Sequence, residues 1–207
     1  MLTNTGTADV PIPALGWPGE VRHVRIGSLE LENGVVLADA AMSYACWGRL
    51  NATRSNAVLL HHGLMSGVRA APTAERSDGW FSRYIGAERP LDPASFWICC
   101  PNVLGGSDGS TGPPTASPSG TTWGVDFPTI TVRDQVAAER LLAATLGISR
   151  WRLVVGPSMG GMRTLEWLIE AGDAVAAALV LGCAPASTAA QAAVRAAQMA
   201  MIRADPH

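Results

Sequence analysis

The stretch Arg152–Leu168, RLVVGPSMGGMRTLEWL, decides which fold this chain adopts. It starts with an apolar run typical of a buried strand, passes through GPSMG at 156–160, and continues with a pattern typical of a helix. G-x-S-x-G alone is a weak pattern, but between a strand and a helix it predicts a sharp turn that projects a serine hydroxyl above a sheet. The sequence therefore predicts that Ser158 is a nucleophile at a strand-to-helix turn.

The residues next to Ser158 fit this interpretation. Gly160 and Gly161 are small enough to let the helix approach the strand closely. The helix N-terminus favours negative charge on the attacked carbonyl, so the backbone N–H of Met159 is one predicted oxyanion donor. The alternative is a serine in a plain turn or in a glycine-rich phosphate loop. A Walker loop would need a Gly-Lys pair, and the chain contains no lysine.

A second glycine-rich loop, HHGLMSG at 61–67, follows the apolar run Ala57–Leu60. A loop at this position supplies the other oxyanion donor in such an architecture, and we assign it to the backbone N–H of Leu64. The alternative is that His61 and His62 merely end a strand and Gly63 permits a turn. Neither histidine is predicted to be the general base, because the base follows the nucleophile in chain order here. We expect both to shape the loop.

Three residues are predicted to line the substrate site: Gly63, Gly160 and Arg163. Gly63 and Gly160 flank the predicted oxyanion donors, and Arg163 lies on the helix after the nucleophile. The alternative for Arg163 is a solvated side chain, which is common for a lone arginine on a helix.

The rest of the chain predicts a mostly parallel sheet with flanking helices. Residues 23–48 predict two strands around a turn at Asn33-Gly34. Thr131 and Asp134 form a near capping box that opens a helix to about residue 146. Residues 71–92 are expected to be irregular with one short helix. Further strands are predicted at Ala57–Leu60, Phe96–Cys100, Leu153–Val155 and Ala177–Leu181, an alternation typical of a parallel sheet covered on both faces.

Length and composition exclude several classes of protein. The 207 residues, 48% of them apolar, suit one domain with a sizeable core, preceded by an extended arm at 1–20. The net charge is −2 and the arginines form no run, so neither nucleic acid nor a membrane is expected as a partner. Four cysteines without a C-x-x-C pair predict reduced thiols, no metal site and a cytoplasmic protein.

Three motifs recur in a known family in the same order: GRLN at 48–51, PNVLG at 101–105 and SMGGM at 158–162. With the elements between them, they resemble the homoserine O-acetyltransferase family of α/β-hydrolase-fold enzymes. The resemblance runs from about residue 26 to residue 206. It implies an α/β-hydrolase fold of which this chain holds the N-terminal half, with an incomplete core at 21–186 and the start of a helical lid at 187–207.

The same resemblance implies an activity. The enzymes of this family move an acetyl group from acetyl-CoA, or a related acyl-CoA, to the hydroxyl of an amino acid in methionine or cysteine biosynthesis. The resemblance implies that acyl-CoA is a co-substrate and that no cofactor stays bound. It is also compatible with a homodimer of the full-length form. The chemistry is coherent, because Ser158 would attack the thioester and an alcohol would resolve the acyl-enzyme. Transfer exceeds hydrolysis only where the lid excludes water.

The sequence also departs from the family pattern. The family usually has an arginine six residues before the Asp-Pro pair, where this chain has Met199, and Arg195 lies one helical turn away. The acceptor is therefore open, and an ester or thioester hydrolase is the second interpretation. A third is a truncated remnant without catalysis. After Ser158 the only histidine is His207, and the only acids are Glu166, Glu170, Asp173 and Asp205. We expect that the catalytic aspartate and histidine are not in this chain and that it is inactive alone.

Overall fold

A computed structural model describes residues 19–74 and 77–205 of the chain. The strands are β1 (Glu20–Glu30), β2 (Val36–Trp47), β3 (Ala57–Leu60), β4 (Trp97–Pro101), β5 (Leu153–Pro157) and β6 (Ala178–Leu181). The helices are α1 (Val132–Thr145), α2 (Met159–Ala171) and α3 (Ala189–Ala204), with short 3-10 turns η1 (Gly124–Asp126) and η2 (Gly172–Ala174). Each predicted strand and both predicted longer helices are present, with boundaries shifted by three residues or fewer.

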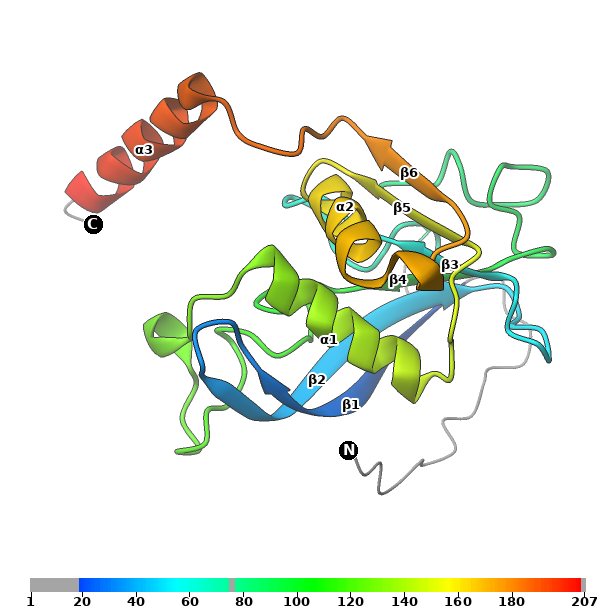
Figure 1. The fold of residues 1–207 in the computed structure, drawn as a ribbon, viewed down its shortest axis with the longest axis horizontal. Coiled ribbons are helices and arrows are strands. Elements are labelled where there is room, and N and C mark those ends of the chain that lie inside the picture. The colour runs from blue at the N-terminus through cyan, green and yellow to red at the C-terminus, as the bar shows by residue number, and fades with distance from the viewer. Residues whose placement is uncertain (1–18, 75–76, 206–207) are drawn as a thin grey trace.

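The strands form one mixed sheet of six strands in the order β1-β2-β4-β3-β5-β6 (Figure 1). β1 and β2 form an antiparallel hairpin, and β2 is also antiparallel to β4. β4, β3, β5 and β6 run parallel to one another. The mostly parallel sheet with flanking helices confirms the predicted fold class. The carboxyl ends of its four parallel strands lie at one edge of the sheet, where α/β proteins place their sites.

Local sequence signals account for the hairpin turn and the bounds of α1. The Asn33 side chain accepts a hydrogen bond from the Val35 N–H, and Gly34 adopts a φ of +82° in the turn between β1 and β2. Thr131 and Asp134 form a full capping box at the start of α1. Gly147, at a φ of +67°, follows the end of that helix. These predictions are confirmed.

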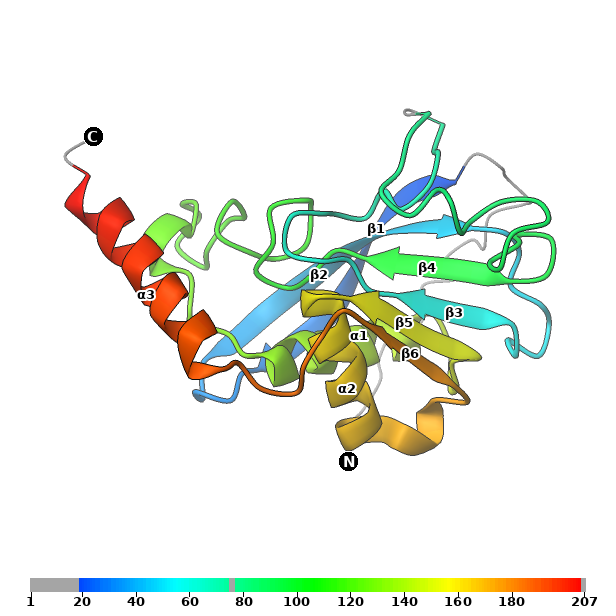
Figure 2. The ribbon, with the colours of Figure 1, turned by 90° about the horizontal axis from the view of Figure 1, so that it is seen from above.

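The two faces of the sheet are covered differently. α1 and α2 pack side by side on one face, where Leu142 and Trp167 join one apolar core (Figure 2). The opposite face is covered by the irregular segment between β3 and β4, whose Val68 and Ile85 join a second core. The expected short helix within 71–92 is wrong for the described residues there, which form turns such as Tyr84 N–H to the Phe81 carbonyl. The apolar side chains of this segment pack against the sheet from a series of turns, so no helix is needed to bury them.

The two ends of the chain differ from the core. Residues 1–18 of the expected arm lie outside the described residues, and Glu20 already belongs to β1. α3 extends away from the sheet (Figure 2), and its side chains are exposed. Its role as the start of a lid stays a prediction. Among residues 19–74 and 77–205, no helix is long and apolar enough to cross a bilayer.

Candidate active site

Ser158 occupies a strained turn between β5 and α2. Its φ of +54° and ψ of −123° lie in a region that residues with a Cβ rarely adopt. Two backbone bonds fix this conformation: the Ser158 N–H donates to the Leu181 carbonyl at 2.9 Å, and the Ser158 carbonyl accepts from Gly161 N–H at 2.8 Å. The side chain is exposed and caps no helix N–H. The predicted sharp strand-to-helix turn is confirmed, and its hydroxyl is open to a substrate.

Gly160 is required for the close approach of α2 to the loop after β3. A Cβ at this position would lie 2.8 Å from the His61 carbonyl oxygen and 2.9 Å from the His62 carbonyl oxygen. These separations are shorter than a van der Waals contact, so any side chain would push the helix away from the loop. The absence of a side chain at Gly160 thus places the two predicted oxyanion segments against each other.

The loop at 61–67 lies beside Ser158. A Cβ on Gly63 would stand 3.8 Å from the Ser158 Cβ and 3.8 Å from the Pro157 carbonyl oxygen. Leu64, the next residue, is 76% exposed. In the part of the chain that the structure describes, the N–H groups of Leu64 and Met159 donate no hydrogen bond to protein. Two free N–H groups therefore flank the serine, and their role as oxyanion donors stays a prediction.

His62 is held in one tautomer by two backbone groups. The Val103 N–H donates to Nε2 at 3.1 Å, so the ring proton is on Nδ1, which donates to the Gly63 carbonyl at 2.8 Å. Burial lowers the pKa of His62 to about 4. The ring is therefore neutral near pH 7 with both nitrogens occupied. It shapes the loop, as predicted, and links it to the 101–113 loop after β4.

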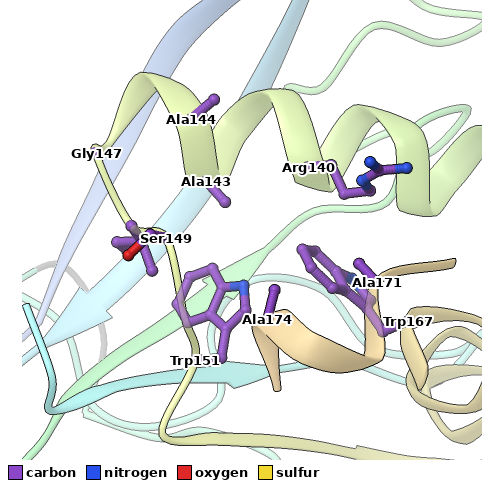
Figure 3. Close-up of a pocket in the computed structure, with 10 residues that line it drawn as sticks. Arg140, Ala143, Ala144, Gly147, Ser149, Trp151, Trp167, Ala171 and Ala174 are labelled. Atoms are coloured by element: carbon purple, nitrogen blue, oxygen red, sulfur yellow. The ribbon is translucent and has the colours of Figure 1, made fainter. Parts of the chain in front are cut away.

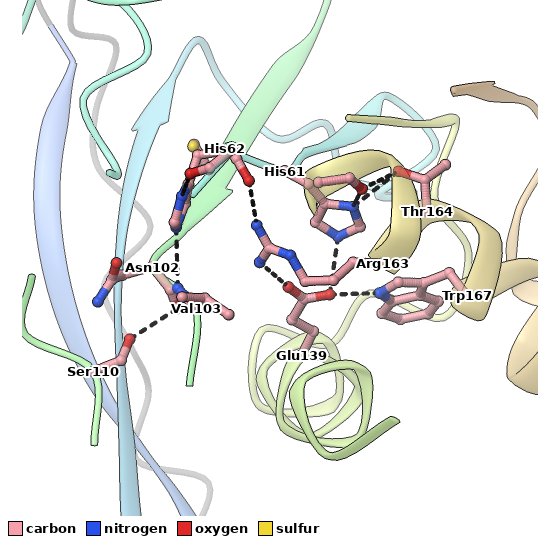
Figure 4. Close-up of polar contacts among 12 residues, drawn as sticks. His61, His62, Asn102, Val103, Ser110, Glu139, Arg163, Thr164 and Trp167 are labelled. Atoms are coloured by element: carbon pink, nitrogen blue, oxygen red, sulfur yellow. Dashed lines mark hydrogen bonds and ion pairs between the residues drawn. The ribbon is translucent and has the colours of Figure 1, made fainter. Parts of the chain in front are cut away.

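His61 belongs to a buried polar network (Figure 4). Its Nε2 lies 2.9 Å from Glu139 Oε2, and its Nδ1 lies 3.0 Å from Thr164 Oγ1. Burial lowers the pKa of His61, and the Arg163 charge lowers it further, against the effect of Glu139. His61 is thus a neutral, occupied ring inside the protein. The geometry agrees with the prediction that it is not the general base.

Glu139 and Arg163 form the charged centre of the same network. Arg163 Nη1 donates to Glu139 Oε1 at 2.7 Å, and Arg163 Nη2 donates to the His62 carbonyl at 2.8 Å. Trp167 Nε1 donates to Glu139 Oε2 at 2.7 Å. Burial alone would raise the pKa of Glu139, but His61, Arg163 and the Trp167 hydrogen bond outweigh it and lower the pKa to about 2. Glu139 is therefore a carboxylate at neutral pH.

The position of Arg163 corrects the expectations drawn from the sequence. The solvated alternative is wrong, because the residue is fully buried at 0% exposure. Contact with substrate does not fit this burial either, since both terminal nitrogens point to Glu139 and to the His62 carbonyl (Figure 4). The α1–α2 contact closes over the guanidinium. Gly63 and Gly160, in contrast, lie close to Ser158, and their role in lining the substrate site stays a prediction.

Sequence reasoning missed Glu139. One signal was available: Glu139 lies three residues from Val136 and from Leu142 on α1, so it interrupts the apolar face of that helix. A charge at such a position indicates either that it has a partner in the core or that the predicted buried face of the helix is wrong.

Recesses also lie outside this centre in the described part of the chain. One of about 480 Å³ adjoins the loop after β3 and is lined by Met65, Ser66, Gly67, Arg69, Asp78, Gly79, Trp80 and Asp108. Another, of about 430 Å³, is an apolar groove between Trp151, Trp167 and the end of α1 (Figure 3). Trp151 precedes the first residue of β5, whereas Ser158 follows its last. The groove is therefore at the opposite edge of the sheet from Ser158.

No general base for Ser158 is identified among residues 19–74 and 77–205. Glu166 and Glu170 lie 3.0 and 3.7 Å from the Arg133 guanidinium on the outer side of α2. His61 and His62 are occupied as described above. His207 lies outside the described residues.

The fold and the serine turn define a class. The chain belongs to the α/β-hydrolase fold family, whose model matches residues 56–200. Within this class its sequence is similar to homoserine O-acetyltransferases, as the motifs implied. The protein of that name from Mycolicibacterium smegmatis is 44% identical over 207 residues, which cover 99% of this chain and 54% of the relative. The chain spans about half the length of the curated relatives it matches.

Solved structures extend the comparison. An acetylester hydrolase from Corynebacterium glutamicum superposes with a TM-score of 0.77 at 32% identity, covering 90% of this chain and 51% of that one. Homoserine O-acetyltransferase from Bacillus anthracis gives a TM-score of 0.71 at 27% identity, covering 76% of this chain and 44% of that one. The neighbours thus include both a transferase and a hydrolase.

Proposed function

We propose that this chain carries the nucleophile and the oxyanion site of an acyltransferase that moves an acetyl or similar acyl group from acyl-CoA to the hydroxyl of homoserine or a related amino acid. The observation that carries the proposal is the exposed, strained Ser158 between the free N–H groups of Met159 and the Gly63–Leu64 loop. The similarity to homoserine O-acetyltransferases supports the substrate class. Acyl-CoA acts as a co-substrate, without a bound cofactor or metal.

The reaction follows from this geometry in two halves. The Ser158 oxygen attacks the thioester carbonyl while a base takes its proton, and the N–H groups of Leu64 and Met159 stabilise the oxyanion. The C–S bond breaks, and the CoA thiolate takes the proton from the base and leaves as the thiol. The amino-acid hydroxyl then attacks the acyl-enzyme, its proton passes to the base and back to Ser158, and the ester product leaves.

The base and its orienting acid are proposed to come from outside residues 1–207, so these residues alone do not turn over. The support is that both described site histidines are neutral and fully hydrogen-bonded. A serine hydroxyl is a weak nucleophile without such a base. Transfer by the 207-residue form at roughly 1 per second or faster, in the usual range of enzymes, would contradict this proposal. The cytoplasmic location and the homodimer remain predictions.

The test uses an active form of the protein that includes the base. With acetyl-CoA, CoA release should depend on homoserine and yield its O-acetyl ester. Ser158→Ala should lower turnover by about 10⁴-fold or more, as the removal of a nucleophile does in triad enzymes. Near-full activity of Ser158→Ala would remove the serine from the mechanism.

An ester hydrolase is the second candidate. Met199 in place of the usual arginine and the similarity to an acetylester hydrolase favour it. CoA release that is indifferent to homoserine, together with rapid hydrolysis of a small acetyl ester, would support the hydrolase over the transferase.

A further inference from the structure

The Glu139–Arg163 pair is a pair of opposite charges buried at 1% and 0% exposure. Removal of two charges from water costs several kcal/mol per ion, and an apolar pair of similar volume often serves packing equally well. The pair therefore needs a reason beyond core packing. Its hydrogen bonds are directional: each Glu139 oxygen accepts from an identified donor, and Arg163 uses one nitrogen for Glu139 and another for a backbone carbonyl.

That carbonyl belongs to His62, which directly precedes the Gly63–Leu64 segment. The 2.8 Å bond from Arg163 Nη2 thus ties the loop to α2, the helix that begins at the serine turn. Glu139 ties the same guanidinium to α1. The ring of His61 adds a third connection, because it bridges Glu139 to Thr164 on α2. The links through Arg163 and Thr164 join the loop to α2, which begins at the serine turn, and Glu139 joins both to α1.

We propose that Glu139 and Arg163 are positioning residues, which orient the Leu64 N–H toward the oxyanion by fixing the His62 carbonyl relative to Ser158. The inference rests on the proposed function. Oxyanion donors act only when held in place before the reaction, and a misplacement of about 1 Å can cost on the order of 10²-fold in rate. Because both side chains are buried and bond to Glu139, Arg163, His61, Trp167 and the His62 carbonyl rather than to Ser158, the pair acts through the loop that it holds.

The test compares four variants in the active form: Glu139→Gln, Arg163→Met, the double variant and Glu166→Gln. Glu166→Gln is the matched control, since it removes a carboxylate from a partly exposed ion pair with Arg133. We expect each single variant to lower kcat by about 10- to 100-fold with little change in KM for acyl-CoA, and the control to change neither. The loss is smaller than or similar to that from deletion of one oxyanion donor.

The double variant separates positioning from folding. It leaves no unpaired buried charge, so its thermal stability should return toward that of the unmodified protein, while kcat per folded molecule stays low. Amide hydrogen exchange at 63–66 should be faster in all three network variants and unchanged in Glu166→Gln. A double variant whose kcat recovers with its stability, or exchange at 63–66 that does not change, would overturn the proposal.

The outcome remains distinct from failure of the proposed function. If Ser158→Ala inactivates the enzyme while the network variants keep full kcat, the positioning role is wrong and the serine mechanism stands. If Ser158→Ala stays active, the proposed function is wrong, and hydrogen exchange still decides whether the pair holds the loop.

Discussion

The strained backbone at Ser158 should lower the stability of the protein by an amount that a glycine substitution can measure. Its φ of +54° and ψ of −123° are easy for glycine and cost a residue with a Cβ on the order of 1–3 kcal/mol. Glycine loses about 0.5–1 kcal/mol more conformational entropy on folding. Ser158→Gly should therefore raise the free energy of unfolding by about 0.5–2 kcal/mol. Ser158→Ala keeps the Cβ and the strain, and the serine side chain caps no helix N–H, so its stability should stay close to that of the unmodified protein.

Urea denaturation of the three proteins, with thermal unfolding in parallel, measures this difference. A gain of 1 kcal/mol corresponds to about 2–4 °C in Tm for a chain of this size. Ser28→Gly is the matched control, because Ser28 is exposed in β1 and is absent from the residues with positive φ. That change should lower stability. If Ser158→Gly is no more stable than Ser158→Ala, the turn is not strained in solution and the local reasoning is refuted.

Three further predictions concern the loops around the site. His62 takes up a proton below about pH 6.5 in the unfolded chain, but only below about pH 4 in the folded chain. The free energy of unfolding should therefore fall by about 3 kcal/mol as the pH drops from 6.5 to 4. A His62→Gln variant with the same pH slope would contradict this. Gly160→Ala should lower kcat by about 10-fold or more and destabilise by about 1–3 kcal/mol, because its Cβ meets the His61 carbonyl at 2.8 Å; unchanged kinetics would show that the loop adapts. Gly106→Val should disturb the loop after β4, because a Cβ there lies 2.9 Å from the Val103 carbonyl; unchanged substrate affinity in a folded variant would argue against a role for this loop in the pocket.

Several features of the site could be predicted because they are local. The strand-to-helix turn at Ser158 depends on five consecutive residues between a strand and a helix. The capping box at Thr131 depends on four. Steric limits on φ and ψ and short hydrogen bonds act within such windows, so a pattern in the sequence is enough to predict them. The same holds for the Asn33-Gly34 turn.

Other expectations failed because they depend on long-range packing. A short helix was expected within 71–92, but that segment covers a face of the sheet as turns, and its side chains enter the second core. The sheet is covered on both faces, as expected, but α1 and α2 share one of them. Neither outcome is encoded in periodicity, because the strand order and the crossovers of the whole chain decide which face each segment meets.

The sequence by itself determined the class of the protein, the turn that presents Ser158 and the glycine-rich loop at 61–67. Only the tertiary structure decided the environment of the charges. Glu139 and Arg163 are 24 positions apart, and His61 is 78 positions from Glu139, yet they share one buried network. An arginine on a helix is solvated or buried according to the surface that packs against it, and that surface is formed by distant segments. The fate of Arg163 therefore required the assembled fold, whereas the strained backbone at Ser158 required only its neighbours.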